Sequence, residues 1–414
     1  MPYVLERWCS HISSTSERMR GLAVALVLAM PAALRAQAGD TVASRALGSG
    51  VAYRHFVDTR GPWVMHLVRV DLRRDAGGVE IRLERAREQL KGRERTSEIA
   101  RRVSLAGPGV LAAVNADFFW LTTGENENNQ VIGGEWWKGV KVTDSPYDTF
   151  DNTHSQFALD GAGRPLLDRF TLDAKAWRRG VGTPIINVNV NPSGNPEGTA
   201  LYTWRYGATT PRDTTRLTAE AALIASGHRG DTALYVRRGK VSSTSGSPIP
   251  PGGAVLAAYG NGSRTREVQA MADGDTVRIL LGTLPRMPGG SPSMLVGGWP
   301  RILRDGDEVA SDAPTLEGTI SRNAELRHPR TAIGFSRDSS TLYLLTVDGR
   351  STVSVGMTLP ELAGIMRQLG AWQALNFDGG GSTTMVVDGA VMNSPSDPAG
   401  EREVGNAVLV VRKP

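Results

Sequence analysis

A carboxylate, three consecutive glycines and three hydroxyl residues stand together in the stretch 376–385 (NFDGGGSTTM). Three glycines weaken a helix or strand, because glycine loses more backbone entropy on ordering than any other residue. Between the apolar segments 371–377 and 385–387 they favour a tight loop that lets a ligand approach the backbone. Free N–H groups in such a loop can bind an anion, and Asp378 would lie at its mouth. The alternative is a glycine-rich hairpin capped by an aspartate.

A second group of polar residues, Asp348-Gly-Arg350, follows the apolar segment 342–347. An arginine at the end of a strand could hold a phosphate through two parallel hydrogen bonds. Asp348 could be a second reacting carboxylate or only a turn residue. Arg330 and Arg402 are further candidates for binding an anion, and either could instead form a structural salt bridge.

The elements that would position these residues are clearest in the C-terminal third. Residues 358–369 predict a helix, with a capping box made by Thr358 and Glu361 and an end at Gly370. Apolar side chains follow helical spacing at Leu362, Ile365, Met366 and Leu369. Polar residues therefore stand where apolar strands end, which is where α/β folds tend to place ligand sites.

Many short apolar segments separated by turn signals predict a β-rich chain. The 414 residues include 48 Gly and 23 Pro, which favours strands and turns over a helical bundle. We expect an α+β fold with a mixed β-sheet core and a few helices, rather than a doubly wound Rossmann sheet. Residues 39–109 would supply N-terminal strands and a helix packed on the core. Residues 110–411 would form the main domain, with residues 180–285 as an extra inserted β lobe.

Residues 1–38 are predicted to be a signal peptide. The apolar run 21–34 follows two arginines and is too short for a transmembrane helix. Ala36-Gln-Ala38 is a small-residue cleavage site. The only cysteine, Cys9, precedes this site, so the mature chain would have no disulfide, thiolate metal site or cysteine nucleophile. We expect a secreted or periplasmic protein without a stable membrane anchor after cleavage.

Charge and motifs exclude several functional classes. The net charge of +5 is spread along the chain, which does not indicate a nucleic-acid-binding protein. The histidines show no metal-ligand spacing, and the lack of a G-x-S-x-G motif disfavours a serine hydrolase. We expect no cofactor. The loop 125–129, together with Asp117, could bind Ca²⁺, although such polar loops are usually only solvated.

Six stretches together resemble the phosphodiester glycosidase family. They agree in order and spacing at 115–119, 328–334, 346–350, 356–361, 375–384 and 393–406. The resemblance extends from about residue 110 to residue 411, strongly over 294–411 and weakly over 180–285. Family members often have two glycines where this chain has Ala116 and Asp117, so the resemblance does not mark Asp117 as an essential acid.

The resemblance implies hydrolysis of a sugar-1-phosphodiester at the C1–O bond. That chemistry requires that the protein binds the phosphate and offsets its negative charge. It also requires a sugar ring that can gain oxocarbenium character and a carboxylate that activates water or attacks C1. Asp378 is the first candidate for this carboxylate, and Asp348 is the second. The expected partner is a glycan or sugar-phosphate substrate.

The remaining candidates would bind the phosphate or the sugar hydroxyls. The predicted substrate-binding residues are Arg350, Arg330, Arg402, Asn115, Asp117, Asn376, Gly379, Gly380, Gly381, Ser382 and Asn406. Buried asparagines need hydrogen-bond partners. The three asparagines could therefore orient carboxylates, bind sugar hydroxyls or simply hold loops.

The leading hypothesis is an exported glycosidase that acts on a sugar-1-phosphodiester or a related glycan linkage. An alternative is a non-catalytic carbohydrate-binding or exopolysaccharide-assembly protein that uses the same residues. A third hypothesis, a metal-dependent phosphodiesterase, would need a carboxylate and histidine cluster that the sequence does not show.

Overall fold

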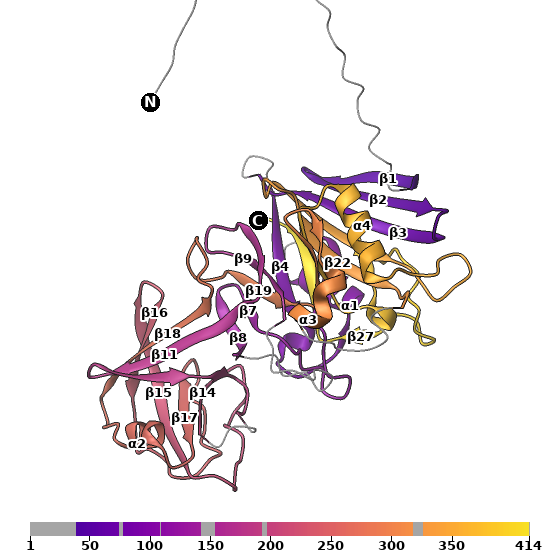
Figure 1. Cartoon of the computed structure of the whole chain (residues 1–414). Coiled ribbons are helices and arrows are strands. Elements are labelled where there is room, and N and C mark those ends of the chain that lie inside the picture. Colours follow the sequence, from indigo (N-terminus) through magenta and orange to yellow (C-terminus); the bar gives the residue numbers. More distant parts are fainter. Residues whose placement is uncertain are drawn as a thin grey trace, which may run out of the picture. The chain divides into compact units, whose positions relative to one another are not determined.

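The chain is mostly β, with large mixed sheets and few helices, as its short apolar segments and frequent turns predicted (Figure 1). The computed structural model describes residues 39–73, 78–107, 109–141, 154–192, 197–317 and 326–413. The predicted signal peptide lies outside the described residues. Within the described ranges, no helix is long and apolar enough to cross a membrane.

The first sheet has eight strands in the order β1-β2-β3-β23-β22-β24-β20-β21. Their bounds are Asp40–Gly48, Val51–Asp58, Trp63–Asp71, Thr341–Val347, Arg330–Phe335, Gln373–Asn376, Arg301–Arg304 and Asp307–Glu308. Strand β22 runs antiparallel to β23, with Arg330 opposite Val347, and antiparallel to β24, with Ala332 opposite Asn376. This register brings the start of β22 and the ends of β23 and β24 to one edge of the sheet.

The second sheet has five strands in the order β26-β25-β6-β28-β4. Their bounds are Ala390–Val391, Met385–Val387, Val110–Asn115, Asn406–Arg412 and Val79–Arg85. Met385 lies opposite Val114, and Ala407 lies opposite Asn115. The end of β6 and the starts of β25 and β28 therefore also meet at one edge.

The two sheets pack face to face, and one helix covers the outer face of each. Strand side chains alternate between faces. Leu344 joins a core cluster that contains Val114 and Val408 of the second sheet, whereas Leu345 joins a cluster with Leu362 of α4 (Leu359–Leu369). Helix α1 (Thr96–Ala106) packs on the other face of the second sheet. The order of layers is therefore α4, first sheet, second sheet, α1.

A third sheet of thirteen strands contains most of residues 130–297. Its order is β10-β9-β19-β7-β8-β13-β14-β17-β15-β16-β18-β11-β12. In sequence order, β7 to β19 span Gln130–Ile132, Glu135–Val140, Gln156–Leu159, Pro165–Asp168, Thr171–Arg178, Val181–Ile185, Asn187–Val188, Gly198–Thr203, Thr218–Arg229, Thr232–Arg237, Ala254–Tyr259, Thr276–Leu284 and Met294–Gly297. β13 and β14 pair in parallel whereas β14 and β17 pair antiparallel, so the sheet is mixed.

The remaining elements are short. A two-stranded sheet joins β5 (Glu94–Arg95) to β27 (Glu403–Val404). Helices α2 and α3 span Ser263–Gln269 and Ala313–Leu316. Among the described residues, 3-10 turns span Ala86–Glu88, Ala310–Asp312 and Gly380–Ser382.

Helix α4 confirms the predicted capping box and end. The Glu361 backbone N–H donates to the Thr358 hydroxyl at 3.3 Å, and the Thr358 N–H donates to the Glu361 carboxylate at 2.9 Å. Gly370 ends the helix in the left-handed region, at φ 105°. Both ends of α4 are fixed by local sequence. The end of α4 therefore determines where β24 begins, and Asp378 follows shortly after β24.

The cap makes a testable contribution to stability. Thr358→Ala removes the hydroxyl acceptor and should lower the free energy of unfolding by about 1 kcal/mol, because one N–H of the first turn loses its partner. The exposed Thr352 is a matched control, and Thr352→Ala should change this free energy by less than about 0.5 kcal/mol. Equal losses in chemical denaturation of the two variants would contradict the cap.

Candidate functional site

The glycine loop crosses from the first sheet to the second. Strand β24 enters it from the eight-stranded sheet, and β25 leaves it in the five-stranded sheet. Between them, Gly380–Ser382 form a single 3-10 turn. The hairpin alternative is therefore wrong, because paired strands of one hairpin would lie in the same sheet.

Asn115, at the end of β6, holds this crossing in place. Its side-chain N–H donates to the Asp378 carbonyl at 2.6 Å. Its carbonyl oxygen accepts from the Thr384 N–H at 3.1 Å and from the Thr331 hydroxyl at 2.8 Å. The side chain is fully buried. One carboxamide thus ties both ends of the loop to β6 and β22, which is the loop-holding role among those predicted for Asn115.

The glycines allow neighbouring groups to approach the loop closely. A Cβ at Gly379 would lie 2.6 Å from the Pro329 carbonyl oxygen. A Cβ at Gly380, whose φ is 59°, would lie 2.9 Å from a guanidinium nitrogen of Arg350. A Cβ at Gly381 would overlap the Arg402 guanidinium. Two arginine side chains therefore lie directly against the loop backbone.

These two arginines differ in their other contacts. Arg402 pairs with Asp397 at 2.7 Å. Arg350 contacts Ser396 Oγ and His328 Nδ1, each at 3.4 Å, and forms no ion pair with a carboxylate of the described part of the chain. Its φ of 60° is uncommon for a residue other than glycine. Arg350 is exposed, so its charge is available to an anion at the loop.

Arg330 lies next to the loop but is committed to the protein backbone. It is buried, and its guanidinium donates to the carbonyl oxygens of Met357 and Leu326, both at 2.9 Å. Burial, and then the charge of Arg350, lower its pKa to about 10. These contacts with carbonyl oxygens give Arg330 a structural role within the described residues.

The Asp378 carboxyl has a raised pKa. Its surface is only partly covered, but dense packing around it removes water, and this desolvation raises the pKa from 3.8 to about 6. Ser382, Arg402 and the Gly379 N–H oppose the shift, and the negative charge of Asp117 adds to it. A carboxyl with this pKa can both hold and release a proton near neutral pH.

Asp117 is the carboxylate whose charge acts on Asp378. It is buried, and it accepts from the Asn128 side chain at 2.7 Å and from the Asn128 N–H at 3.2 Å. Asn406 accepts from the Asp117 N–H at 3.0 Å, which orients the residue from β28. Burial raises the pKa of Asp117, against the hydrogen bonds from Asn128 and the charge of Lys138.

Asp348, the second predicted carboxylate, contacts other residues. It accepts from the Asn393 side chain at 3.2 Å and from the Ser394 N–H at 3.0 Å, and it lies 3.9 Å from His66 Nε2. None of its described contacts reaches Asp378. His66 was not among the site residues predicted from the sequence. Its place opposite Thr346 on a neighbouring strand depends on the pairing of β3 with β23, which no local pattern shows.

Several polar atoms around the loop lack a partner within the described ranges. They belong to buried side chains and are Asn376 Oδ1, Asn406 Nδ2, Ser382 Oγ, Thr383 Oγ1 and Thr384 Oγ1. The Ser382 hydroxyl nevertheless lies close enough to Asp378 to favour its charged form. Buried polar groups without partners are costly unless water or a ligand satisfies them. The loop surroundings therefore offer unused hydrogen-bonding capacity.

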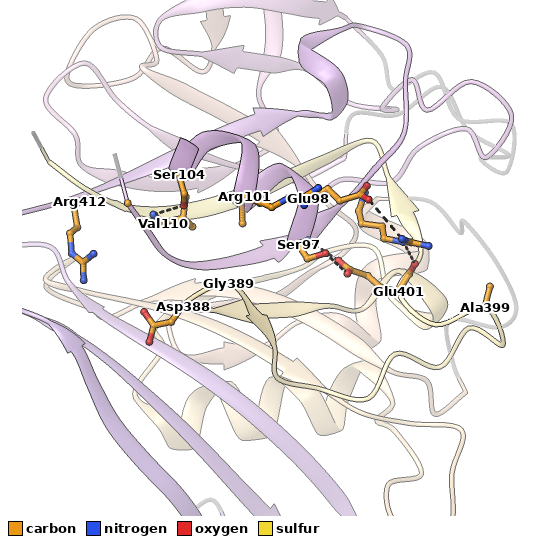
Figure 2. Close-up of a pocket in the computed structure, with 13 residues that line it drawn as sticks. Ser97, Glu98, Arg101, Ser104, Val110, Asp388, Gly389, Ala399, Glu401 and Arg412 are labelled. Atoms are coloured by element: carbon orange, nitrogen blue, oxygen red, sulfur yellow. Dashed lines mark hydrogen bonds and ion pairs between the residues drawn. The ribbon is translucent and has the colours of Figure 1, made fainter. Parts of the chain in front are cut away.

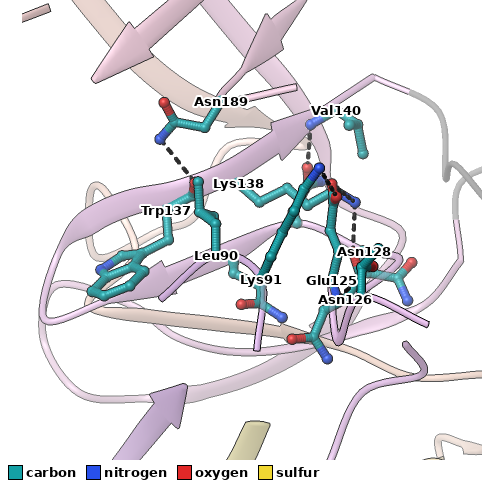
Figure 3. Close-up of polar contacts among 12 residues, drawn as sticks. Leu90, Lys91, Glu125, Asn126, Asn128, Trp137, Lys138, Val140 and Asn189 are labelled. Carbon is teal, nitrogen blue, oxygen red and sulfur yellow. Dashed lines mark hydrogen bonds and ion pairs between the residues drawn. The ribbon is translucent and has the colours of Figure 1, made fainter. Parts of the chain in front are cut away.

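The described residues contain no group of three or more His, Cys, Asp or Glu side chains that could hold a metal ion. In the loop considered for Ca²⁺, Glu125 pairs with Lys91 at 3.3 Å and with Lys138 at 3.4 Å (Figure 3). Asp117 is engaged by Asn128. Glu125 and Asp117 thus already have protein partners.

A hollow of about 810 Å³ lies elsewhere, between α1 and the segments 388–389 and 399–401 (Figure 2). Glu401 reaches the start of α1 there and accepts from the Ser97 N–H at 2.8 Å. Its lining does not include Asp378 or the glycines of the loop. The candidate site is therefore defined by the chemistry of its residues rather than by the size of a cavity.

The raised pKa of Asp378 predicts how stability depends on pH. A folded-state pKa above 3.8 contributes stability that is fully present below pH 3.8 and is lost as the pH rises through 6. Asp378→Asn should therefore gain about 1 kcal/mol relative to wild type between pH 5 and pH 8. The measurement is chemical denaturation at both values.

Asp71→Asn is the control, because hydrogen bonds from Arg73 lower the pKa of Asp71 to about 2 and keep it ionised above pH 5. Its difference from wild type should be the same at pH 5 and pH 8. A constant difference for Asp378→Asn as well would contradict the raised pKa.

The surroundings of Gly379 and Gly381 predict that alanine at these two positions has different effects on stability. Gly379→Ala places a methyl group against a backbone carbonyl and should lower the free energy of unfolding by about 1–3 kcal/mol. Gly381→Ala meets only the flexible end of Arg402 and should cost less than about 1 kcal/mol. Thermal or chemical unfolding of both variants decides this, and equal losses would show that the loop does not have this geometry.

Comparisons with known proteins agree with the sequence motifs. Residues 229–411 match the family model of phosphodiester glycosidase. N-acetylglucosamine-1-phosphodiester alpha-N-acetylglucosaminidase of Mus musculus is 33% identical over 110 residues, which are 25% of this chain and 21% of that protein. The SPbeta prophage-derived uncharacterized protein YomE of Bacillus subtilis (strain 168) is 39% identical over 83 residues, which are 20% of this chain and 13% of that protein. The matches thus span about a fifth or less of these relatives' own length.

The fold also recurs in a solved structure. A hypothetical protein from Synechocystis superposes with a TM-score of 0.66 at 22% identity, covering 88% of this chain and 62% of that chain. At this identity the likeness concerns the fold alone. The resemblance to the phosphodiester glycosidase family that the motifs indicated is thus confirmed over residues 229–411.

Proposed function

We propose that the protein is an exported hydrolase that cleaves the C1–O bond of a sugar-1-phosphodiester, or a related glycan linkage, at the glycine loop. The observation that carries the proposal is a carboxyl with a pKa of about 6 beside a glycine loop that two arginines flank. The family match over residues 229–411 supports a hydrolase of glycosidase type. Export, to the periplasm or the medium, rests on the sequence of residues 1–38.

The loop and its arginines would hold the phosphate. Arg350 is exposed and lies against Gly380, so its guanidinium can offset the charge of a phosphodiester that sits on the loop backbone. Arg402 lies against Gly381 and is held by Asp397. The unpartnered hydroxyls of the loop could donate to phosphate or sugar oxygens.

The reaction would use Asp378 as the carboxylate at C1. Water adds to C1 while the C1–O bond breaks, and the phosphate monoester leaves with the bridging oxygen. In the simplest form, the ionised Asp378 accepts the proton of the attacking water and later releases it to solvent. A phosphate monoester is already a fair leaving group, so this step needs little help from a general acid. The negative charge of Asp117 would disfavour the ionised form of Asp378 and so keep it basic.

Labelled water tests the bond that breaks. The exported chain is incubated with a synthetic N-acetylglucosamine-1-phosphate ester and with a UDP-sugar in ¹⁸O water. We expect label in the released sugar, which means C1–O cleavage. Label in the phosphate would mean P–O cleavage and would overturn the proposal in favour of a phosphodiesterase. No turnover of either ester would favour a carbohydrate-binding protein that does not catalyse.

Two variants separate catalysis from binding. Asp378→Asn should lower kcat by about 10²-fold or more, because general-base catalysis contributes about 10²–10⁴-fold, with little change in KM. Arg350→Met should mainly raise KM for the phosphodiester, since it removes a charge that binds the ground state.

The wild-type kcat should fall below about pH 6 as Asp378 takes up a proton. A rate independent of pH between 5 and 8 would contradict the role of Asp378.

A further inference from the structure

A second hollow, of about 490 Å³, lies away from the glycine loop. Segments 88–91 and 204–207 line it, together with Glu125 and Asn189. Its volume falls in the range of about 300–1,000 Å³ that small-molecule sites occupy. None of the residues assigned to the glycine-loop site lines it.

A tryptophan and an arginine that contacts its ring, Trp204 and Arg205, line one side of this hollow. The Arg205 guanidinium lies over the ring of Trp137 and over the ring of Trp204, at 4.1 Å and 3.7 Å from their centroids. Two contacts to Glu135, at 3.0 Å and 2.7 Å, fix the guanidinium in this position. Trp137 is buried, whereas Trp204 is 46% exposed. The protein therefore holds Trp204 rigidly while leaving much of its surface to solvent.

Polar groups line the rest of the hollow. Glu125 is held by Lys91 at 3.3 Å and by Lys138 at 3.4 Å (Figure 3). Tyr206 adds a hydroxyl, and its pKa is raised by burial and then by the charge of Glu125. The carboxylate can accept hydrogen bonds while the ammonium of Lys91 can donate them.

The charges around the hollow balance. Its lining contains two carboxylates, Glu88 and Glu125, and two cations, Lys91 and Arg205. An anion such as phosphate would gain little here, because both cations already have carboxylate partners. A neutral ligand with several hydroxyl groups and one apolar face fits the combination of an exposed indole and paired charges.

We infer that this hollow is a second carbohydrate site, which binds a neutral pyranose. The apolar C–H face of the sugar would stack on Trp204, and its hydroxyls would bond to Glu125, Lys91 and Tyr206. The site is separate from Asp378. Lys138 pairs with Glu125 and also donates to the Asn126 carbonyl, and the Asn126 side chain donates to the Asp117 carbonyl.

Titration of the mature chain with neutral oligosaccharides tests the site. Maltotriose, cellotriose and chitotriose are the probes, and tryptophan fluorescence and calorimetry are the readouts. Binding of at least one probe should reach saturation. Trp204→Ala should weaken the affinity for that probe by at least about tenfold, equivalent to 1.4 kcal/mol, and Glu125→Gln should weaken this affinity as well.

Two variants serve as controls. Trp177→Ala removes another partly exposed tryptophan that a cation, Lys175, stacks on, outside the hollow, and should leave binding unchanged. Asp378→Asn should also leave it unchanged, so a failure of the proposed hydrolysis would not remove the sugar site. Circular dichroism confirms that each variant is folded.

Two results would overturn the inference. One is that none of the three probes saturates the wild-type chain at millimolar concentrations. The other is that a probe binds but Trp204→Ala and Glu125→Gln, both folded, bind it as tightly as wild type. Competition by inorganic phosphate at this site would also overturn it, because the ligand would then be an anion.

Discussion

The carboxamide of Asn115 is the interaction on which the candidate site depends. Its amide N–H donates to the carbonyl of Asp378. Its amide oxygen accepts from the N–H of Thr384 and from the hydroxyl of Thr331. Because the group is fully buried, none of these bonds is exchanged with water at low cost. The backbone of Asp378 is thus held from β6, a strand far away in sequence.

Local chemistry made part of this structure predictable. Helix α4 begins and ends where its capping box and its glycine place it, and the six motifs identified the family that residues 229–411 match. The glycine loop was predicted because three glycines weaken a helix or strand and favour a tight loop between the apolar segments that flank them. Each of these signals lies within a few residues of the chain.

The parts that could not be predicted depend on long-range pairing. Asp117 influences Asp378 only because β6 and β25 pair and the loop crosses between sheets. Asp348 looked like a second reacting carboxylate, but Asn393, Ser394 and His66 surround it once β3 lies beside β23. Apolar alternation specifies which face of a strand is buried, not which strand lies next to it.

The crossing of the loop between two sheets links ligand binding to folding. A chain in which only one of the two sheets had formed would present only half of the loop, with either Asp378 or Met385 out of place. An anion that bound the complete loop would therefore bind the fully docked state alone, and it would stabilise that state by mass action. Occupancy of this site would then report whether the two sheets are docked, a contact between segments far apart in sequence.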